Sequence, residues 1–345
     1  MSKFQSRLDD FFLKSKTNDY EIKKYFYLIW ENKFRPSLQA YWTDKLPTKI
    51  NFLEKINCNS FKKGYYFYLC GYFSDIDDKE YILSKEKIYK NISYLKSHLQ
   101  KSIRKGDDIL AIPTAYHLLK LDKNELLRRL PIIMFEDTFL HESFTTIIWL
   151  MVVSSNKKFK FKQYIYEWLI GIIYVLCKID KKDNLDDSKD LDINKKIVEK
   201  LDSYKNLETN EFSILYSIYL RISYGGTEND LKMLKLFAEL WESRFINKTI
   251  SINTMNIRPI KLFIKDLDIE NWDLSAIDYH SNSNFLDYIS KKFVDINKEE
   301  IKKMIWINSS NINIREKKDI YNPILWNEIK DYVIKTQKYI LNSSY

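Results

Sequence analysis

Glycine and proline are scarce in this chain, with six of each among 345 residues. Sandwiches and barrels of β-strands need turn residues every few positions, so this scarcity argues against them and favours long helices. The 45% of hydrophobic residues can fill a sizeable core. We therefore expect a mostly α, multi-helix body with room for two helical subdomains. At most a small β element is expected near residues 64–73, a short aromatic run bounded by Gly64 and Ser74.

Apolar spacing marks the expected helices. From Tyr20 onwards, the spacing of Ile22, Phe26 and Ile29 predicts a helix that ends before Pro36. Residues 84–177 have a helical pattern almost throughout, with a first helix that ends at Gly106 as its C-cap. Further helices are expected at 211–224, 229–245, 284–294, 297–306 and 323–341.

A mixed-charge run with few hydrophobic residues covers 180–196 and predicts an exposed linker. The expected organisation is a flexible tail at 1–18, a helical domain at 19–179, this linker, and a second helical domain at 197–345. The longest apolar stretches, 146–153 and 164–177, are too short to span a bilayer. They predict core helices of a soluble protein without a membrane partner.

The N-terminal tail carries a spaced set of residues, Q-S-R-L-D-D-F-F, in which Gln5 precedes Leu8, Phe11 and Phe12. One turn of tight helix brings positions i, i+3 and i+6 to the same side. The leucine and the two phenylalanines then form a three-pronged apolar plug. Buried aromatic anchors of this kind usually dominate the binding energy of an interface.

This pattern resembles the PCNA-interacting peptide, or PIP box, through which proteins of DNA replication and repair bind a sliding clamp. The resemblance implies a PCNA-type clamp as partner, with the plug in a pocket on the clamp and the Gln5 side chain hydrogen-bonded in a separate small site. The alternative is the first turn of an ordinary amphipathic helix. Because the chain has five glutamines, a chance match to the whole pattern is expected far less than once.

Residues 94–137 resemble the helical collar that follows the ATPase module in MgsA/RarA clamp-loader-like proteins. The matching elements are Lys101-Ser102-Ile103-Arg104, Asp107-Asp108, Ala111 to Ala115, Arg128-Arg129-Leu130 and Glu136-Asp137. W-E-N-K-F-R-P at 30–36 is similar to the Trp-Glu-Lys-Tyr-Arg-Pro entry of clamp-loader small subunits, with one extra residue. The chain departs from these families because it contains no G-x-x-x-x-G-K-[ST] loop to hold ATP phosphates. A collar-like domain without the motor, and without a cofactor, is therefore expected.

Five basic residues of this region are candidates for contact with DNA phosphates: Lys101, Arg104, Lys105, Arg128 and Arg129. The first three occur at spacings i, i+3 and i+4, which share one helix face. The alternative is structural. In that interpretation, Arg104 or Arg129 pairs with Glu136 or Asp137 to tie the helices together, and the lysines face water.

The net charge of +9 is compatible with a nucleic-acid partner, although the abundance of lysine, asparagine and isoleucine is also typical of an A+T-rich genome. Three widely spaced cysteines predict neither a disulfide framework nor a zinc site, and they favour a reducing intracellular compartment. PCNA-type clamps occur in eukaryotes, archaea and large DNA viruses. The expected location is the nucleus or a cytoplasmic site of viral replication.

Catalytic patterns are weak. His141-Glu142 lacks the second histidine of an H-E-x-x-H zinc motif, and no metal ligand set is predicted. Asp278-Tyr279-His280 suggests general acid/base chemistry, but an aspartate that caps a turn beside a histidine is commoner. The sequence thus predicts a clamp-binding accessory factor of DNA replication or repair. The alternatives are a clamp-recruited enzyme such as a nuclease, and a structural helical subunit with an accidental motif.

Overall fold

The computed structural model describes residues 24–31, 37–60, 64–73, 89–185, 209–261 and 271–343. These divide into two compact units, each built from two separate stretches of chain. The first comprises the described residues up to 73 together with 209–248, and the second comprises 89–185 together with 249–343. This division differs from the two consecutive helical domains expected from the sequence. The run at 180–196 is described only as far as Leu185.

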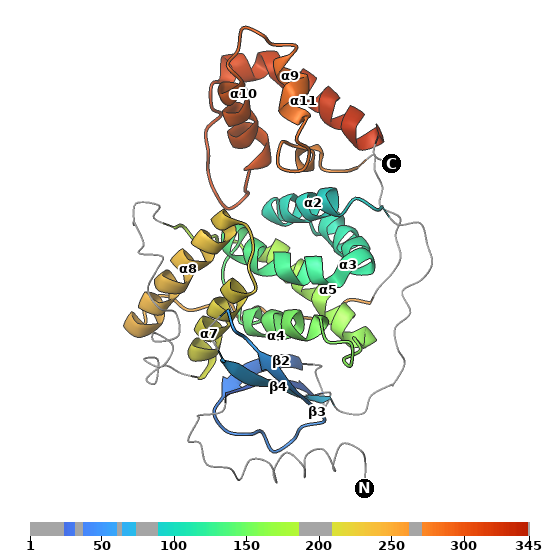
Figure 1. The fold of residues 1–345 in the computed structure, drawn as a ribbon. Helices are drawn as coiled ribbons and strands as arrows, with labels where there is room; N and C mark the ends of the chain where they lie inside the picture. The colour runs from blue at the N-terminus through green and yellow to red at the C-terminus, as the bar shows by residue number, and fades with distance from the viewer. Residues whose placement is uncertain are drawn as a thin grey trace. The chain divides into compact units, whose positions relative to one another are not determined.

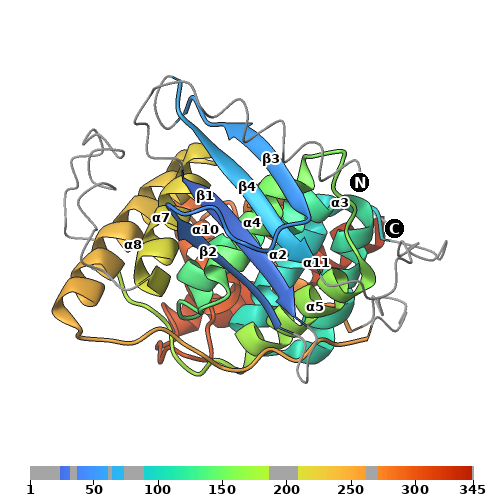
Figure 2. The same cartoon turned by 90° about the horizontal axis from the view of Figure 1, so that it is seen from below.

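The first unit is built on a four-stranded sheet in the order β2-β1-β4-β3 (Figure 2). The central strands β1 and β4 are parallel to each other. The edge strand β2 pairs antiparallel with β1, and the edge strand β3 pairs antiparallel with β4. The strands are β1 Tyr25–Glu31, β2 Ser37–Thr43, β3 Phe52–Asn57 and β4 Tyr66–Phe73. The element expected near 64–73 is therefore confirmed as β4, but the sheet extends well beyond it.

Strand β1 corrects the helix predicted from Tyr20. The spacing of Phe26 and Ile29 fits a helix, but in β1 these side chains lie on opposite faces of the sheet. Both faces of this strand are largely buried, so the polar alternation that would indicate a strand is missing. Pairing with β2 and β4 overrides the local pattern.

Among its described residues, this unit also contains the helices α7 Thr209–Ser223 and α8 Glu228–Asn247, both close to the predicted ranges. Helix α7 is joined to β2 at Trp42, whose backbone N–H donates to Ser213 Oγ at 2.9 Å and whose indole N–H donates to Ser217 Oγ at 3.1 Å. The Trp42 ring also stacks on Phe26, with ring centroids 4.2 Å apart. These contacts explain why α7, distant in sequence, belongs with the strands: a sheet must bury its apolar face.

The second unit is helical (Figure 1). Its elements are α2 Ile92–Arg104, α3 Asp108–Asp137, α4 Phe144–Ser154, α5 Gln163–Lys178, the 3₁₀ turn η1 Leu274–Ala276, α9 Phe285–Ser290, α10 Lys298–Ile305, the π turn η2 Trp306–Ser310 and α11 Pro323–Ser343. The helices predicted between 84 and 177 and in the C-terminal part are thus confirmed over the described residues. The fold is mostly α with a small sheet.

The turn between α2 and α3 forms as its residues predict. Gly106 follows the last turn of α2 with a φ of 69°, a conformation in which glycine is favoured. A Cβ atom there would also lie 3.2 Å from the carbonyl oxygen of Cys177. The Asp107 side chain then accepts from the Leu110 N–H and caps α3. Helix α3 bends at Asp122, where the backbone leaves the helical region.

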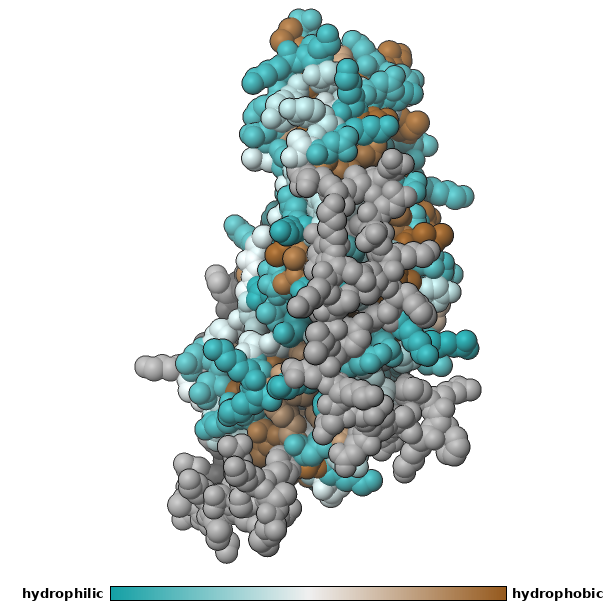
Figure 3. Space-filling view, turned by 90° about the vertical axis from the view of Figure 1, so that its right-hand side faces the viewer, coloured by the Kyte–Doolittle hydropathy of each residue, from teal (hydrophilic) through white to brown (hydrophobic). Residues whose placement is uncertain are grey.

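Helices α4 and α5 are the apolar stretches expected to be core helices, and most of their side chains are buried. None of the described helices combines the length with the hydropathy that crossing a bilayer requires. On the face shown in Figure 3, the described residues are mostly hydrophilic and their hydrophobic side chains form separate small patches.

Candidate functional site: a buried charged network on helix α2

The basic residues predicted on α2 lie mainly inside the second unit. Lys101 and Arg104 are buried and Lys105 is half-buried. Each of the three forms an ion pair with a carboxylate from another element. The polar face of α2 therefore packs against charged partners, and its apolar face against the hydrophobic core.

Arg104 joins α2 to the end of α3. Its Nε donates to Asp137 Oδ1, and its Nη2 donates to Glu136 Oε1 at 3.2 Å. A further N–H donates to the carbonyl oxygen of Ser310 in η2. These contacts are those of the structural interpretation, because Arg104 pairs with both Glu136 and Asp137.

Lys101 joins α2 to the segment after η1. Its Nζ donates to Asp278 Oδ2 at 2.9 Å and to Ser97 Oγ at 2.8 Å. The other carboxylate oxygen of Asp278 accepts from the backbone N–H groups of His280 and Ser281. Burial acts to raise the pKa of Asp278, but the charge and hydrogen bond of Lys101, together with smaller contributions from Ser310 and His280, outweigh it, so the pKa lies below its usual range. Asp278 is thus an ionised turn cap paired to a buried lysine.

The residues before η1 are attached to α2 through Lys105 and His98. Lys105 Nζ lies 2.8 Å from Asp273 Oδ2. The Asp273 N–H donates to His98 Nε2, so His98 Nδ1 carries the proton and donates to Thr114 Oγ1 at 2.7 Å. The His98 ring stacks on Trp272, with ring centroids 3.9 Å apart. Burial lowers the pKa of His98 to about 3, so the ring is neutral.

Of the two arginines predicted on α3, Arg129 belongs to the network. It donates to Gln100 Oε1, and Gln100 in turn donates to Asp137 Oδ2 at 2.7 Å. Arg128 is half-exposed beside it. Lys101, Lys105, Arg104 and Arg129 thus form three groups of bonds around α2, centred on Asp278, Asp273 and Asp137. DNA binding by these residues stays a prediction, and at Lys101 and Arg104 it would require breaking buried ion pairs.

Arg315 is a central residue that the sequence did not suggest. Its guanidinium donates to carbonyl oxygens at the ends of two helices: Leu176 at 2.8 Å and Ile179 at 2.6 Å beside α5, and Ile103 and Arg104 at 3.1 Å in α2. The last carbonyls of a helix have no partner within the helix. Arg315 supplies donors to both helix ends, from a position more than 130 residues away in sequence.

The other candidate patterns occupy structural positions. His141 is buried, accepts from the Ser143 N–H through Nδ1 and donates from Nε2 to the Met255 carbonyl at 2.9 Å. Glu142 beside it is exposed. His280 follows the Asp278 turn and is exposed, with its ring 5.4 Å from Trp306. Across the described stretches of the chain, no group of three or more His, Cys, Asp or Glu side chains could hold a metal ion.

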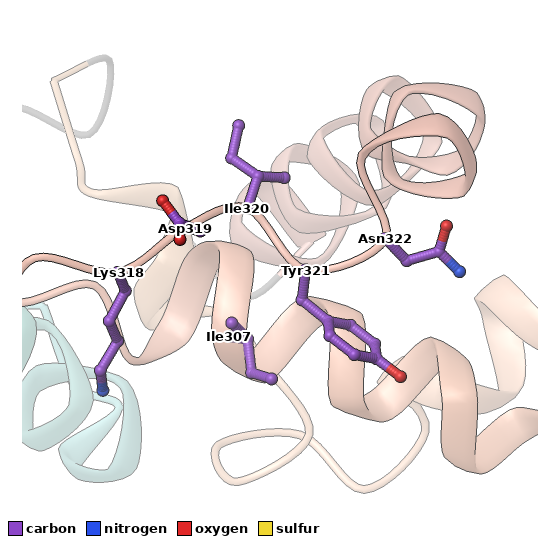
Figure 4. A pocket seen from close by; sticks show the side chains of 6 residues that line it. All are labelled: Ile307, Lys318, Asp319, Ile320, Tyr321 and Asn322. Atoms are coloured by element: carbon purple, nitrogen blue, oxygen red, sulfur yellow. The ribbon is translucent and has the colours of Figure 1, made fainter.

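An open surface hollow lies beside η2, lined by Ile307 and residues 318–322. Figure 4 shows that Asp319 and Ile320 point to one side of the backbone and Lys318 and Tyr321 to the other. The polar groups therefore do not converge on a common point, as they would in a site that orients a small ligand.

The predicted clamp-binding residues Gln5, Leu8, Phe11 and Phe12 lie outside the described residues. Comparison with known proteins adds no assignment, because no family model, curated protein or solved structure matches this chain.

Proposed function

We propose that this protein is an accessory factor of DNA replication or repair that binds a PCNA-type sliding clamp through its N-terminal residues. The observation that carries the proposal is the sequence Q-S-R-L-D-D-F-F. It supplies Gln5, an aliphatic residue at Leu8 and the aromatic pair Phe11 and Phe12 at the spacing of a PIP box.

The position of this motif supports a tethering role. It ends at Phe12, and strand β1 begins at Tyr25, so a dozen residues connect the two. A connection of this length spans up to about 40 Å when extended. A clamp-bound peptide would then hold the body near DNA at a high effective concentration, without a large interface between body and clamp.

The α2–α3 region gives secondary support. Among the residues that resemble a clamp-loader collar, Arg104 of the Lys-Ser-Ile-Arg element pairs with the Glu136-Asp137 element. The first and last of the collar-like elements, which are far apart in the sequence, are therefore in direct contact in the structure. A helical module of this kind, without a nucleotide-binding loop, suits a role in contacts with DNA or with other replication proteins.

A pull-down with a PCNA-type clamp tests the proposal on the full-length chain. Phe11→Ala combined with Phe12→Ala should abolish capture by the clamp. Because the proposal assigns these two side chains to the clamp and not to the protein's own core, the melting temperature should stay within about 2 °C of the unchanged protein. The matched control is Phe4→Ala, which removes a nearby phenylalanine outside the motif and should leave capture intact.

Two results would contradict the proposal. One is undiminished capture of the doubly substituted protein, which would place clamp binding elsewhere or nowhere. The other is unfolding of that protein, which would make Phe11 and Phe12 part of its own core.

A further inference from the structure

Three exposed apolar side chains gather beside the turn between α2 and α3. Ile109 in the first turn of α3 is 78% exposed, Ile314 is 61% exposed and Tyr174 on α5 is 40% exposed. Single apolar side chains at a surface are ordinary, whereas a cluster of large ones marks a site of interaction with another protein. We name these three residues the turn surface.

Ile314 is fixed against the turn. A Cβ atom on Gly106 would lie 2.5 Å from Ile314 Cδ1, so the isoleucine packs on the bare backbone of this glycine. The Ile314 N–H donates to the Arg104 carbonyl at 3.3 Å, and the neighbouring Arg315 holds the ends of α2 and α5. The position of Ile314 is therefore set before any partner binds, which lowers the cost of ordering it on association.

Tyr174 is joined to the start of α3 by an ion pair. Lys178 Nζ lies 2.6 Å from Asp108 Oδ1, and the same Nζ lies 5.2 Å from the centroid of the Tyr174 ring. Asp108 immediately precedes Ile109 in the chain. The turn surface is thus assembled from α3, α5 and the segment around residue 314, all within the second unit.

Asp180 and Lys181 adjoin the turn surface just after α5. The carbonyl of Ile179, directly before them, accepts from Arg315 at 2.6 Å, and Arg315 follows Ile314. Both charged side chains are exposed, and neither forms an ion pair with another residue in the part of the chain that the structure describes. The turn surface therefore has two adjacent charges of opposite sign at its edge.

We propose that the turn surface is an interface between two copies of this chain related by a two-fold axis. In such an interface, the same surface patch of both copies faces itself. The three apolar side chains of each copy then form the interface core and the charged side chains form its rim, the usual arrangement in protein interfaces. Lys181 of one copy pairs with Asp180 of the other, and the symmetry makes this contact twice.

The opposite signs of Asp180 and Lys181 favour a second copy over a charged partner. DNA or an acidic peptide would be attracted by the lysine and repelled by the aspartate. Against a second copy, each charge meets its opposite. The inference goes beyond clamp binding and does not rest on it.

Sedimentation velocity of the full-length protein, without a clamp, tests the proposal. A small interface dissociates in the micromolar range, so the fraction of dimer should rise between about 1 and 100 μM protein. Ile109→Gln with Ile314→Gln removes two of the three apolar side chains and should weaken dimerisation by about tenfold or more. The matched control is Val294→Gln with Ile334→Gln, at exposed positions of the same unit outside the turn surface, and it should leave dimerisation unchanged.

Reversal of the two rim charges provides a test that is specific for pairing between copies. Asp180→Lys makes both rim charges positive and Lys181→Asp makes both negative, so each variant alone should dimerise less because like charges meet. An equimolar mixture of these two variants should dimerise at least as well as the unchanged protein, because every charge then meets its opposite.

Three results would overturn the proposal. They are a monomer at every concentration of the unchanged protein, an equal loss in the Val294 and Ile334 control, and a mixture that dimerises no better than its two components. Circular dichroism melting checks that each variant is folded. Should the isoleucine variant unfold, the mixture of charge variants decides the question by itself. Because no clamp is present, the outcome is independent of the clamp pull-down.

Discussion

Helix α2 and the connection between α4 and α5, residues 157–162, which we name the lysine loop, both carry closely spaced basic residues, but they differ in how deeply these residues are buried. On α2, Lys101 and Arg104 meet Asp278 and Asp137 and are buried. In the lysine loop, Phe161 is buried and Phe159 half-buried, whereas Lys157, Lys158 and Lys160 are exposed. On α2, carboxylates from distant segments hold basic side chains inside the fold, whereas in the lysine loop the phenylalanines take the inner positions and most of the lysines stay exposed.

The largest effect is expected where a buried pair is broken. Lys101→Ala leaves the Asp278 carboxylate buried without its ammonium partner, which should reduce the free energy of unfolding by about 3–5 kcal/mol. Denaturant unfolding measures this directly. The double variant Lys101→Met with Asp278→Asn keeps a hydrogen-bond acceptor for the turn but removes the buried charge. Its free energy of unfolding should be at least about 1 kcal/mol higher than that of Lys101→Ala. A loss below about 1 kcal/mol for Lys101→Ala would mean that the pair is not buried as described.

The next largest effect is a dependence of the free energy of unfolding on pH. The pKa of His98 is lowered by burial to about 3 in the folded state, and in the unfolded chain it is about 6.5. Between these values the unfolded state binds a proton that the folded state does not, so stability falls as the pH falls below about 6.5. The slope from this residue approaches about 1.4 kcal/mol per pH unit. His141, whose pKa burial also lowers, acts in the same direction.

Replacing His98 by Gln should flatten this dependence between pH 6 and pH 4, as measured by urea unfolding at each pH. The matched variant His280→Gln, at an exposed position, should leave most of the slope in place. An unchanged slope in the His98 variant would contradict the neutral, buried ring.

A smaller effect is expected at Arg315. Arg315→Lys keeps the positive charge but cannot reach the carbonyl oxygens at the ends of both α2 and α5, so some of them lose a donor. We expect a loss of about 2 kcal/mol in unfolding free energy. Hydrogen exchange should accelerate in the last turns of both helices. Exchange confined to one helix end would show that Arg315 does not bridge them.

The smallest effect on stability is expected in the lysine loop. Lys157→Glu, Lys158→Glu and Lys160→Glu change exposed side chains, so unfolding free energy should change by less than about 0.5 kcal/mol for each. The contrast with Lys101→Ala is the sharpest form of the comparison. Should the loop substitutions destabilise the protein as strongly as Lys101→Ala, the distinction between inward and outward lysines would be wrong.

Local sequence signals predicted those elements whose pattern and partners lie close together in the chain. Gly106 ends α2 as expected, and the apolar spacing of 323–341 corresponds to α11. Strand β1 was mistaken for a helix because its strand character comes from pairing with β2 and β4. The pairing partner of Lys101 lies 177 residues away, so no local pattern could distinguish a phosphate-binding lysine from a buried one.

The lysine loop illustrates the opposite case. Its alternation of Lys and Phe is visible in the sequence, and the direction of each side chain follows once the phenylalanines are assigned to the interior. Arg315 gave no such signal, because its acceptors are backbone carbonyls, which every residue has.

We propose that residues 1–18 bind a sliding clamp, and a titration of this segment as a free peptide tests the proposal most directly. Calorimetry with a PCNA-type clamp should show saturable binding with one peptide per clamp subunit, and a peptide with Phe11→Ala and Phe12→Ala should give no heat of binding. Absence of saturable binding by the unchanged peptide, or equal binding by the substituted one, would contradict the account.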